Sequence, residues 1–389
     1  MLIKPRQHLA TLSAQPLGRS EKPFPADRRV LSSGPLWTPP TRTSLLRAAR
    51  PARAVPAEDY TSQFHRTQGW TGADGTYSVP LADGSTLWLF SDTFIGSVRQ
   101  DGSRAPGLKF VNNTVAHQTS PGQVEFFHGG REGEPQALFT PPDGKGWFWL
   151  HDAHQNREGT VQVLLGQFDR TPEGGALGFE AVGNWVGDLK MTTSGPKVTG
   201  YTKLDHFQKG GDGKPSIFFG SATLREKDWL YLYGVRDYGH NKESVLARVR
   251  PDQLKNDDDW QFFTGSEWSS EMDEAGTIAD NVSVEYSVHR TAVGDYAMVS
   301  QKGGAGPEVQ VRRAPSPEGP WSEPTTVWSA PENKGQDLAY NAKAHPELSD
   351  ERGLLISYNV NSLDWERNLK VADVYRPRFI RVPDPTLLA

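Results

Sequence analysis

LWLFSD at residues 87–92 is the first of five short apolar segments that each end in a small or polar residue. The others are WFWLHD at 147–152, WLYLYG at 229–234, DYAMVS at 295–300 and LLISYN at 354–359. Their starts are separated by 60, 82, 66 and 59 residues, spacings that are longer than a solenoid unit and typical of propeller blades with long loops. The sequence therefore predicts an all-β fold, a five-bladed β-propeller.

Each segment is expected to be the second strand of a hairpin, because a turn and an earlier strand precede it. These preceding sequences are YSVPL-ADGS, ALFTPP-DGKG, IFFGSATL-REKD, SVEYSVHR-TAVG and YNAKAHPEL-SDER. A third strand follows each hairpin: VNNTVAHQ, TVQVLLGQF, SVLARV, EVQVRR and LKVADVY. An aromatic fourth strand follows in four blades, and we expect an N-terminal strand, YTSQFHR at 60–66, to complete the fifth and close the ring. A pair of β-sandwiches is the alternative fold, but it gives no reason for five equivalent hairpins.

The two parts of the chain differ in charge. Residues 1–57 hold ten Lys or Arg, two acids and nine prolines without sustained periodicity, which predicts a basic Pro/Arg-rich arm, disordered or extended. Residues 58–389 are predicted to form one propeller. The arm shows neither aromatic interleaving nor a basic helical face, so no nucleic acid partner is expected.

Composition excludes several classes of protein. The chain has no cysteine, so disulfides, thiolate metal sites and a Cys nucleophile are absent. It has no apolar run of the length of a membrane span, and no apolar stretch typical of a secretory signal. We expect a soluble monomer. The sequence does not indicate the cellular compartment of the protein. Only the substrate class suggested below favours extracellular or periplasmic action.

Two carboxylates are predicted to meet at one end of the propeller. In such a fold the first strand of a blade begins, and its second strand ends, on the same face. Asp83 in the first turn lies midway between Asp74 and Asp92, so these two residues are expected to be cross-strand neighbours, with Cβ atoms about 5 Å apart. Two carboxylates this close favour a shared proton, which suits glycoside cleavage. The alternative is that Asp74 and Asp92 only stabilise turns or loops.

Other polar side chains are predicted to converge on the same face and to suit sugar hydroxyls. The candidate substrate-binding residues are Trp70, Asn112, Asn113, His151, Arg236, Asp237, Tyr238, Asn341, Lys343 and His345. Trp70 and Tyr238 would be stacking platforms, whereas His345 could equally be a structural histidine. Glu285 and Asp152 are the candidates for a further catalytic carboxylate.

No cofactor is required by this chemistry, but a structural Ca²⁺ or Na⁺ on the propeller axis is a possible addition, since oxygen ligands converge there. The chain contains none of the HExxH, GxSxG or phosphate-loop patterns of other enzyme classes.

Several of these segments also carry a resemblance to known proteins. They are GWTGADGTYSVPLADGSTLWLFSDTF, FVNNTVAHQ, WLYLYGV, APSPEGPW, YNAKAHPEL and YRPRFI. Together they resemble a bacterial propeller family that is similar to the endo-arabinanases that cut D-arabinan and, more distantly, to arabinanase, xylosidase and levansucrase propellers. The resemblance spans about residues 66–382. It implies a glycosidase whose essential carboxylates include Asp74 and Asp92.

The sequence thus predicts a glycoside hydrolase that cleaves a furanose-containing or related polysaccharide, arabinan-like in type. A non-catalytic carbohydrate-binding propeller is the alternative. If Asp74 and Asp92 act alone, their short separation predicts retention of anomeric configuration. A partner on another blade, Glu285 or Asp152, would predict inversion, and the distant relatives favour this wider arrangement.

Overall fold

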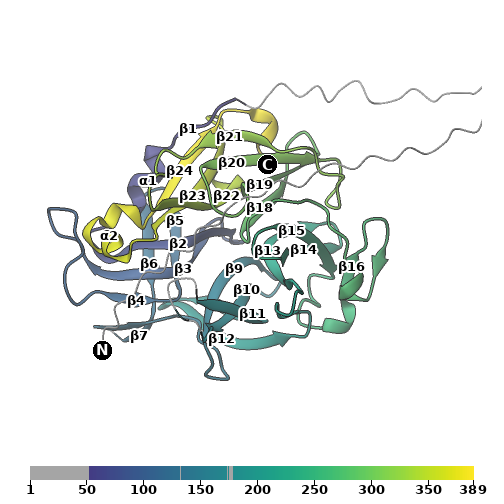
Figure 1. The fold of residues 1–389 in the computed structure, drawn as a ribbon, viewed down its shortest axis with the longest axis horizontal. Coiled ribbons are helices and arrows are strands. Elements are labelled where there is room, and N and C mark those ends of the chain that lie inside the picture. Colours follow the sequence, from purple (N-terminus) through teal and green to yellow (C-terminus); the bar gives the residue numbers. More distant parts are fainter. Residues whose placement is uncertain (1–51, 132, 173, 175–177) are drawn as a thin grey trace, which may run out of the picture. The chain divides into compact units, whose positions relative to one another are not determined.

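The computed structural model describes residues 52–131, 133–172, 174 and 178–389. Five antiparallel sheets are arranged around a common axis as the blades of a propeller, which confirms the predicted fold (Figure 1). The innermost strands of neighbouring blades lie side by side in a closed ring. In ring order these strands are β2 (Gln68–Pro80), β9 (Trp147–Gln155), β13 (Ser216–Glu226), β18 (Tyr286–Arg290) and β22 (Asp337–Ala344). We call the end of the axis at which these strands begin the mouth.

The outer strands follow in antiparallel order within each blade. Blade one adds β3 (Thr86–Ser97), β5 (Thr114–Ser120) and β6 (Gln123–Phe127), with β4 (Lys109–Val111) paired to β3. Blade two adds β10 (Val161–Arg170), β11 (Phe179–Thr192) and β12 (Gly195–Leu204). Blade three adds β14 (Trp229–Asp237), β15 (Lys242–Val249), β16 (Gln261–Phe263) and β17 (Trp268–Ser269). Blade four adds β19 (Tyr296–Gln301), β20 (Glu308–Ala314) and β21 (Thr325–Ser329).

Blade five contains β23 (Leu354–Ser362), β24 (Pro377–Val382) and, from the other end of the chain, β1 (Val55–Pro56). A separate hairpin joins β7 (Gly129–Arg131) to β8 (Glu134–Gln136). The described helices are α1 (Glu58–Thr61) and α2 (Trp365–Lys370). Single 3₁₀ turns lie at Ser62–Phe64, Asp257–Asp259, Met272–Glu274, Pro346–Leu348, Ala372–Val374 and Pro385–Leu387.

Ring closure by an N-terminal strand is confirmed, but the segment predicted to make it was wrong. Val55 and Pro56 pair with Arg381 and Ile380 of β24. Residues 60–66 instead form the end of α1 and a 3₁₀ turn, because Tyr60 and Phe64 have helical spacing and both rings pack on Phe379. Residues 54–57 therefore belong to the propeller, and residues 1–51 of the predicted arm lie outside the described residues.

Two further strand assignments need correction. In blade two WFWLHD lies in the innermost strand β9, and ALFTPP forms no strand, since the prolines at 141 and 142 cannot donate ladder hydrogen bonds. In blade five LKVADVY covers the end of α2 and a 3₁₀ turn, while the third strand is β24. That strand begins at Pro377, a position at which a sheet tolerates proline.

The core consists of clusters between successive blades, because both faces of each sheet are covered. Between blades one and two, for example, Leu89 and Val115 pack with Phe148 and Leu165. The junction of blades five and one is the most aromatic: Phe64, Trp88 and Phe379 pack there in contact. The blades thus hold one another in fixed positions, which gives a rigid frame for side chains near the axis.

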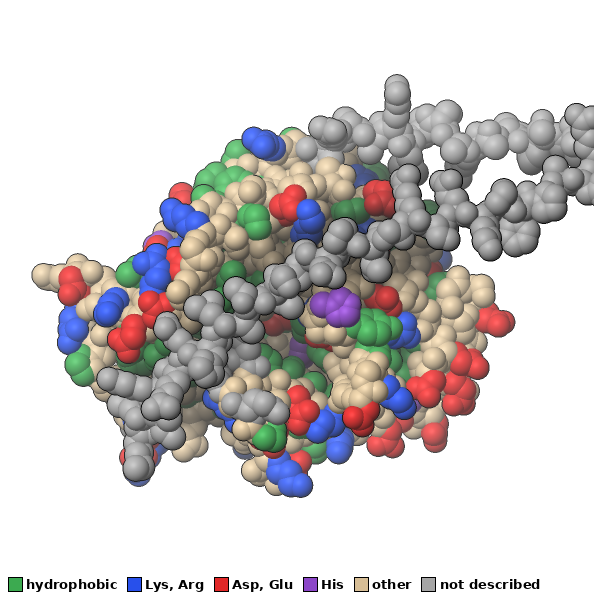
Figure 2. All heavy atoms as spheres, in the orientation of Figure 1, with side chains coloured by type: hydrophobic (Ala, Val, Ile, Leu, Met, Phe, Trp, Pro, Cys, Tyr) green, Lys and Arg blue, Asp and Glu red, His purple; other side chains and the backbone are tan. Residues whose placement is uncertain are grey.

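The surface near the outer strands of blade three is acidic (Figure 2). Its exposed carboxylates are Asp258, Asp259, Glu267, Glu271, Asp273 and Glu274. Such a surface repels phosphate backbones. In the part of the chain that the structure describes, no helix has both the length and the apolar character needed to cross a membrane.

Candidate functional site

Asp74 lies where the ladder between β2 and β3 is interrupted. Ala73 is opposite Thr93 and Tyr77 is opposite Leu89. In both pairs the two residues are equally far from Asp83, as the hairpin predicted from the sequence requires. Between these pairs Gly75 is opposite Phe90, so Asp74 faces two residues, Ser91 and Asp92. A bulge of this kind re-aims a side chain out of the regular sheet.

The residues after Asp74 have an unusual backbone conformation. Gly75 and Thr76 both have positive φ, 80° and 61°. A β-branched residue such as Thr76 adopts this conformation at a cost of about 1–3 kcal/mol, and it persists only where the surroundings hold it. Asn359 of β23 supplies that support, since its side-chain amide donates to Thr76 Oγ1 at 2.9 Å and to the Ala73 carbonyl at 3.4 Å.

Two tyrosines of blade five hold the Asp74 carboxyl. The hydroxyls of Tyr340 and Tyr375 both donate to Oδ2, at 2.8 and 2.9 Å. Oδ1 is buried and accepts no hydrogen bond from a described group. Burial, followed by the negative charges of Asp92 and Glu285, raises the pKa of Asp74 to about 8. At neutral pH Asp74 is therefore a protonated acid, whose proton belongs on Oδ1 because Oδ2 already accepts two bonds.

Asp92 has a different environment. Its Oδ1 accepts hydrogen bonds from the amide of Asn112 at 3.0 Å and from the indole N–H of Trp149 at 2.9 Å. Burial raises the pKa of Asp92 to about 6, and these two N–H donors limit the rise because they stabilise the ionised form. The two carboxyls are thus separated in pKa, with Asp92 ionised under conditions in which Asp74 keeps its proton.

A buried ion pair lies beside Asp74. Lys343 of β22 is 1% exposed, and its ammonium contacts Glu285 Oε2 at 2.6 Å, donates to the Asn341 carbonyl at 3.0 Å and lies 4.2 Å from the centre of the Tyr77 ring. Burial lowers the pKa of Lys343, while the carboxylates of Glu285, Asp74 and Asp152 oppose that shift. Glu285 therefore forms an ion pair with Lys343, and its negative charge acts on Asp74.

Asp152 is held elsewhere on the axis. Its Oδ2 accepts from the backbone N–H and hydroxyl of Thr223, at 2.6 and 3.0 Å, and its Oδ1 accepts from the Ala153 N–H. Burial raises the pKa of Asp152 to about 6. These bonds tie Asp152 to β13 of blade three, so we assign it no part in the pair formed by Asp74 and Asp92.

Three residues predicted to bind substrate are buried among other side chains of the propeller. Asn113 is fully buried and bonds to the backbone of Phe139 and Phe148, joining blades one and two. His345 is fully buried between the hydroxyls of Ser78 and Ser357. Trp70 is 4% exposed, and its ring stacks on Phe126 at 4.7 Å. Their contacts are with other parts of the propeller, and their binding of a substrate stays a prediction.

The predicted residues of blade three lie at the end of β14 and directly after it. Arg236 bonds to the Ala275 carbonyl and to Glu243, and Asp237 accepts from the Gly239 N–H and pairs with Lys242. Tyr238, which follows them in the chain, is exposed. The polar groups of Arg236 and Asp237 thus bond within the blade, and their binding of a substrate stays a prediction.

His151 is buried in β9, near the rings of Tyr77 and Phe218. Neither of its ring nitrogens has a hydrogen-bond partner among the described residues. Burial lowers the pKa of His151 to about 3, so the imidazole is neutral. His151 thus contributes an uncharged ring to the axis.

Three of the residues that bond to Asp74 and Asp92 were not singled out from the sequence. Tyr340 precedes Asn341, Tyr375 begins YRPRFI, and Trp149 lies inside WFWLHD, so all three occur in motifs that were noticed for other reasons. Their roles depend on contacts between residues far apart in the chain. Tyr375 and Asp74, for example, are 301 positions apart.

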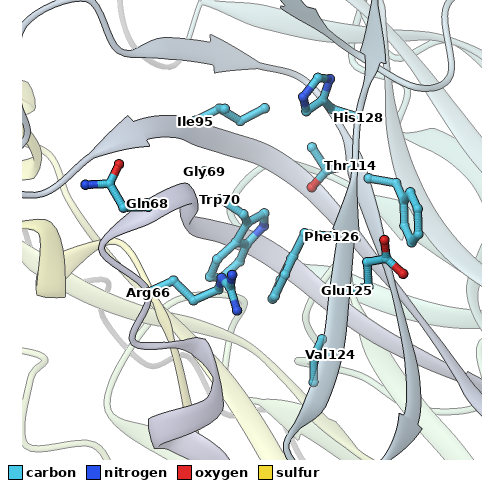
Figure 3. A pocket seen from close by; sticks show the side chains of 11 residues that line it. Arg66, Gln68, Gly69, Trp70, Ile95, Thr114, Val124, Glu125, Phe126 and His128 are labelled. Carbon is cyan, nitrogen blue, oxygen red and sulfur yellow. The ribbon is translucent and has the colours of Figure 1, made fainter. Parts of the chain in front are cut away.

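A pocket of about 340 Å³ opens on blade one (Figure 3). Arg66, Trp70, Ile95, Glu125 and Phe126 are among its lining residues, and Asp74 and Asp92 are not. The Arg66 guanidinium lies 5.0 Å from the centre of the Phe126 ring. We therefore place the candidate active site at the two carboxyls and not in this pocket.

Comparison with known proteins places the chain in a sequence family. The family described as "Domain of unknown function (DUF5005)" matches residues 57–384, which is almost the whole propeller. The chain belongs to the DUF5005 family. Notoamide biosynthesis cluster protein J' of Aspergillus versicolor is 30% identical over 175 residues, which are 44% of this chain and 46% of that relative. The chain thus spans less than half the length of this curated relative.

Solved structures resemble this member of the DUF5005 family in fold. A putative hydrolase from Bacteroides ovatus has a TM-score of 0.69 at 21% identity, covering 84% of this chain and 89% of that one. An α-L-arabinofuranosidase from Podospora anserina, solved with cellotriose, has a TM-score of 0.48 at 11% identity, covering 82% and 98%. The first similarity establishes the shared fold alone, and the second is too weak to bear on activity.

Proposed function

We propose that this DUF5005 protein is a glycoside hydrolase that cleaves a furanose-containing or related polysaccharide, with Asp74 and Asp92 as its reacting carboxyls. The observation that carries the proposal is the pair itself. Two adjacent carboxyls have environments that separate their pKa values, to about 8 and about 6. One protonated acid beside one carboxylate is the combination that glycosidic bond cleavage requires.

Asp74 is the proton donor in this proposal. The glycosidic oxygen accepts the Oδ1 proton as its bond to the anomeric carbon breaks, and the hydroxyls of Tyr340 and Tyr375 then stabilise the carboxylate that remains. Burial, together with the charges of Asp92 and Glu285, keeps Asp74 protonated until that moment. Lys343 neutralises Glu285 in part, so the acid is not so weak that proton transfer becomes unfavourable.

Asp92 supplies the negative charge. Asn112 and Trp149 fix its Oδ1 and leave Oδ2 for the anomeric carbon. Since Lys343 binds Glu285 and Thr223 binds Asp152, we assign the chemistry to the pair of blade one and favour retention through a covalent glycosyl intermediate on Asp92. The activity is expected to be highest between about pH 6 and pH 8, where Asp92 is ionised and Asp74 is not.

The substrate class is supported by the sequence resemblance of the first-blade motif and not by the pair, which would serve many sugars. The test is therefore a panel of arabinans, galactans, xylans and fructans assayed for new reducing ends, with Asp74→Asn and Asp92→Asn beside the wild type. Loss of at least about 10³-fold in rate is expected in each variant, because each removes one of two interdependent groups.

Asp228→Asn is the matched control, since this exposed aspartate lies in the turn between β13 and β14, at the end of the axis opposite the mouth. NMR of the anomer first released distinguishes retention from inversion, and an inverted product would contradict the assignment of Asp92 as nucleophile. Cleavage that survives both substitutions would remove the proposed site. Binding without cleavage by the wild type would favour a carbohydrate-binding propeller instead.

The proposed hydrolase needs no cofactor. A Ca²⁺ or Na⁺ on the axis would need several oxygen ligands, and the described residues include no group of three His, Asp or Glu placed to hold a metal. The Lys343 ammonium already lies against Glu285, and it would repel a second cation there. We propose that Lys343 supplies the axial positive charge.

A further inference from the structure

Two large aromatic side chains are exposed side by side, although most aromatic rings of the protein are buried. Phe110 of β4 is 39% exposed and Trp365 of α2 is 48% exposed. Their ring centres are 5.2 Å apart, with the planes nearly perpendicular at 87°. The two residues come from blades one and five, the blades that also supply Asp74 and its two tyrosines. Exposed aromatic surface of this kind marks binding sites more often than single scattered apolar residues do.

The aromatic pair is connected to Asp74 through one residue. The Tyr375 ring packs on Phe110 at 6.2 Å and on buried Phe94 at 5.0 Å, and its hydroxyl donates to Asp74 Oδ2 at 2.9 Å. Phe94 in turn packs on both Phe110 and Trp365, at 4.6 and 5.5 Å. Phe110 and Trp365 therefore lie near the reacting carboxyls, on the surface side of Tyr375.

The position of Phe110 in the chain also indicates that its ring lies near Asp92. Asn112, which donates to Asp92, is two residues after Phe110. Residues at this separation in an extended chain are about 7 Å apart. A sugar ring next to the one that reacts with Asp92 is thus within reach of the Phe110 ring.

Both aromatic residues are held in place by their supports. Asp364 accepts a hydrogen bond from the Glu366 N–H at the start of α2, and Arg367 of the same helix binds both oxygens of Asp337 at 2.7 to 2.9 Å. Arg104 lies 4.1 Å from the centre of the Phe94 ring and fixes it from behind. A rigid aromatic surface binds a ligand without a large loss of conformational freedom.

We infer that Phe110 and Trp365 form a stacking platform for a sugar of the polysaccharide next to the bond that is cleaved. This inference rests on the proposed function. The carbon–hydrogen face of a sugar is apolar and packs on an aromatic ring, while its hydroxyls stay in water. The occupant is a carbohydrate chain because the platform is only two rings wide and packs on Tyr375, which holds the reacting Asp74. The protein therefore discriminates by chain length and prefers a polymer to a single glycoside.

The experiment compares Phe110→Ala and Trp365→Ala with the wild type on the polysaccharide that the panel identifies and on the shortest oligosaccharide of the same linkage that is cleaved. Loss of one stacked ring is expected to raise KM for the polymer about 3- to 10-fold, with kcat within about 2-fold. The increase should be much smaller for the short substrate. Phe110→Tyr and Trp365→Phe should restore KM, which a purely structural defect would not allow.

Val293→Ala is the control, because Val293 is an exposed apolar residue in the turn between β18 and β19, at the opposite end of the axis. An unchanged KM for the polymer in both alanine variants would overturn the platform and leave the hydrolase proposal intact. Equal losses on the long and the short substrate would also overturn it.

If the wild type cleaves none of the polysaccharides, the hydrolase proposal fails, and the platform is tested by affinity electrophoresis in gels containing soluble arabinan, galactan, xylan or fructan. Retardation of the wild type that is lost in Phe110→Ala and Trp365→Ala would support the platform. Retardation that is equal in all variants, or absent in the wild type, would refute it.

Discussion

Replacement of Asp74 by asparagine should make the protein more stable at neutral pH while it abolishes activity. Wild-type Asp74 is a carboxyl whose pKa is raised from 3.8 to about 8 by burial and by the charges of Asp92 and Glu285. The asparagine side chain of the Asp74→Asn variant would have the same shape and keep an oxygen that accepts from Tyr340 and Tyr375, but it carries no ionisable proton. The Asp74→Asn variant therefore lacks this ionisable group and keeps nearly the same packing.

The sign and size of the effect follow from proton linkage. Between about pH 4 and pH 8 the native protein holds a proton on Asp74 that the unfolded chain has released, so the free energy of unfolding falls as pH rises. The limiting slope is about 1.4 kcal/mol per pH unit for one such group. Between pH 5 and pH 7 this gives at most about 3 kcal/mol, and partial relaxation of the site makes about 1 to 3 kcal/mol the expected loss in the wild type.

The assay is the melting temperature of both proteins at pH 5, 6, 7 and 8, with Asp228→Asn as the control for charge removal at an exposed position. Relative to the wild type, Asp74→Asn should gain about 1 to 4 °C between pH 5 and pH 7. The contribution of Asp92 is largely common to both proteins and cancels in the difference. Parallel curves for the two proteins would refute the raised pKa, and with it the role of Asp74 as a protonated acid.

Two further perturbations test the surroundings of Asp74. Lys343→Met leaves Glu285 buried without its partner and should cost about 3 to 5 kcal/mol of unfolding free energy, and adding Glu285→Gln in the same chain should restore much of it. Exhaustive chelation of the wild type should change neither activity nor melting temperature. A fall in either would show that a metal, and not Lys343, carries the positive charge on the axis. Gly72→Ala should lower kcat by at least about tenfold, because a Cβ at Gly72 would lie 1.9 Å from the Tyr375 carbonyl oxygen and displace the tyrosine that holds Asp74. Gly200→Ala is its control, since a Cβ there would meet only Asp188 Oδ2, at 3.5 Å. Full activity of Gly72→Ala would contradict the positioning role of Tyr375.

Most of the fold could be predicted because each blade repeats a local pattern. In blades one, three and four the turn sequences and strand lengths identify the hairpins correctly. The slip in blade two has a physical cause: an apolar run that ends in polar residues is typical of innermost and second strands alike. WFWLHD was therefore placed one strand too far from the axis.

The candidate site was less predictable. The neighbouring positions of Asp74 and Asp92 follow from the length of one hairpin, which is local information. The residues that separate their pKa values are not local, since Tyr340, Tyr375 and Asn359 lie more than 260 positions from their partners in blade one. No periodicity in the sequence reports such contacts. His345 shows the converse, because its motif drew attention while its ring nitrogens are both bonded to serines.

The arrangement connects ring closure to the chemistry of Asp74. Tyr340, Tyr375 and Asn359 belong to blade five, whereas Asp74 and strained Thr76 belong to blade one, so the acid is assembled across the junction at which the ring closes. That junction is held by β1 on β24 and by Phe64, whose ring packs on Phe379 of blade five and Trp88 of blade one. The aromatic contacts stabilise the junction without polar groups of their own. They can therefore offset the strain at Thr76 and the cost of burying three carboxyls and one ammonium beside the axis, which a weaker junction could relieve by separating the two blades.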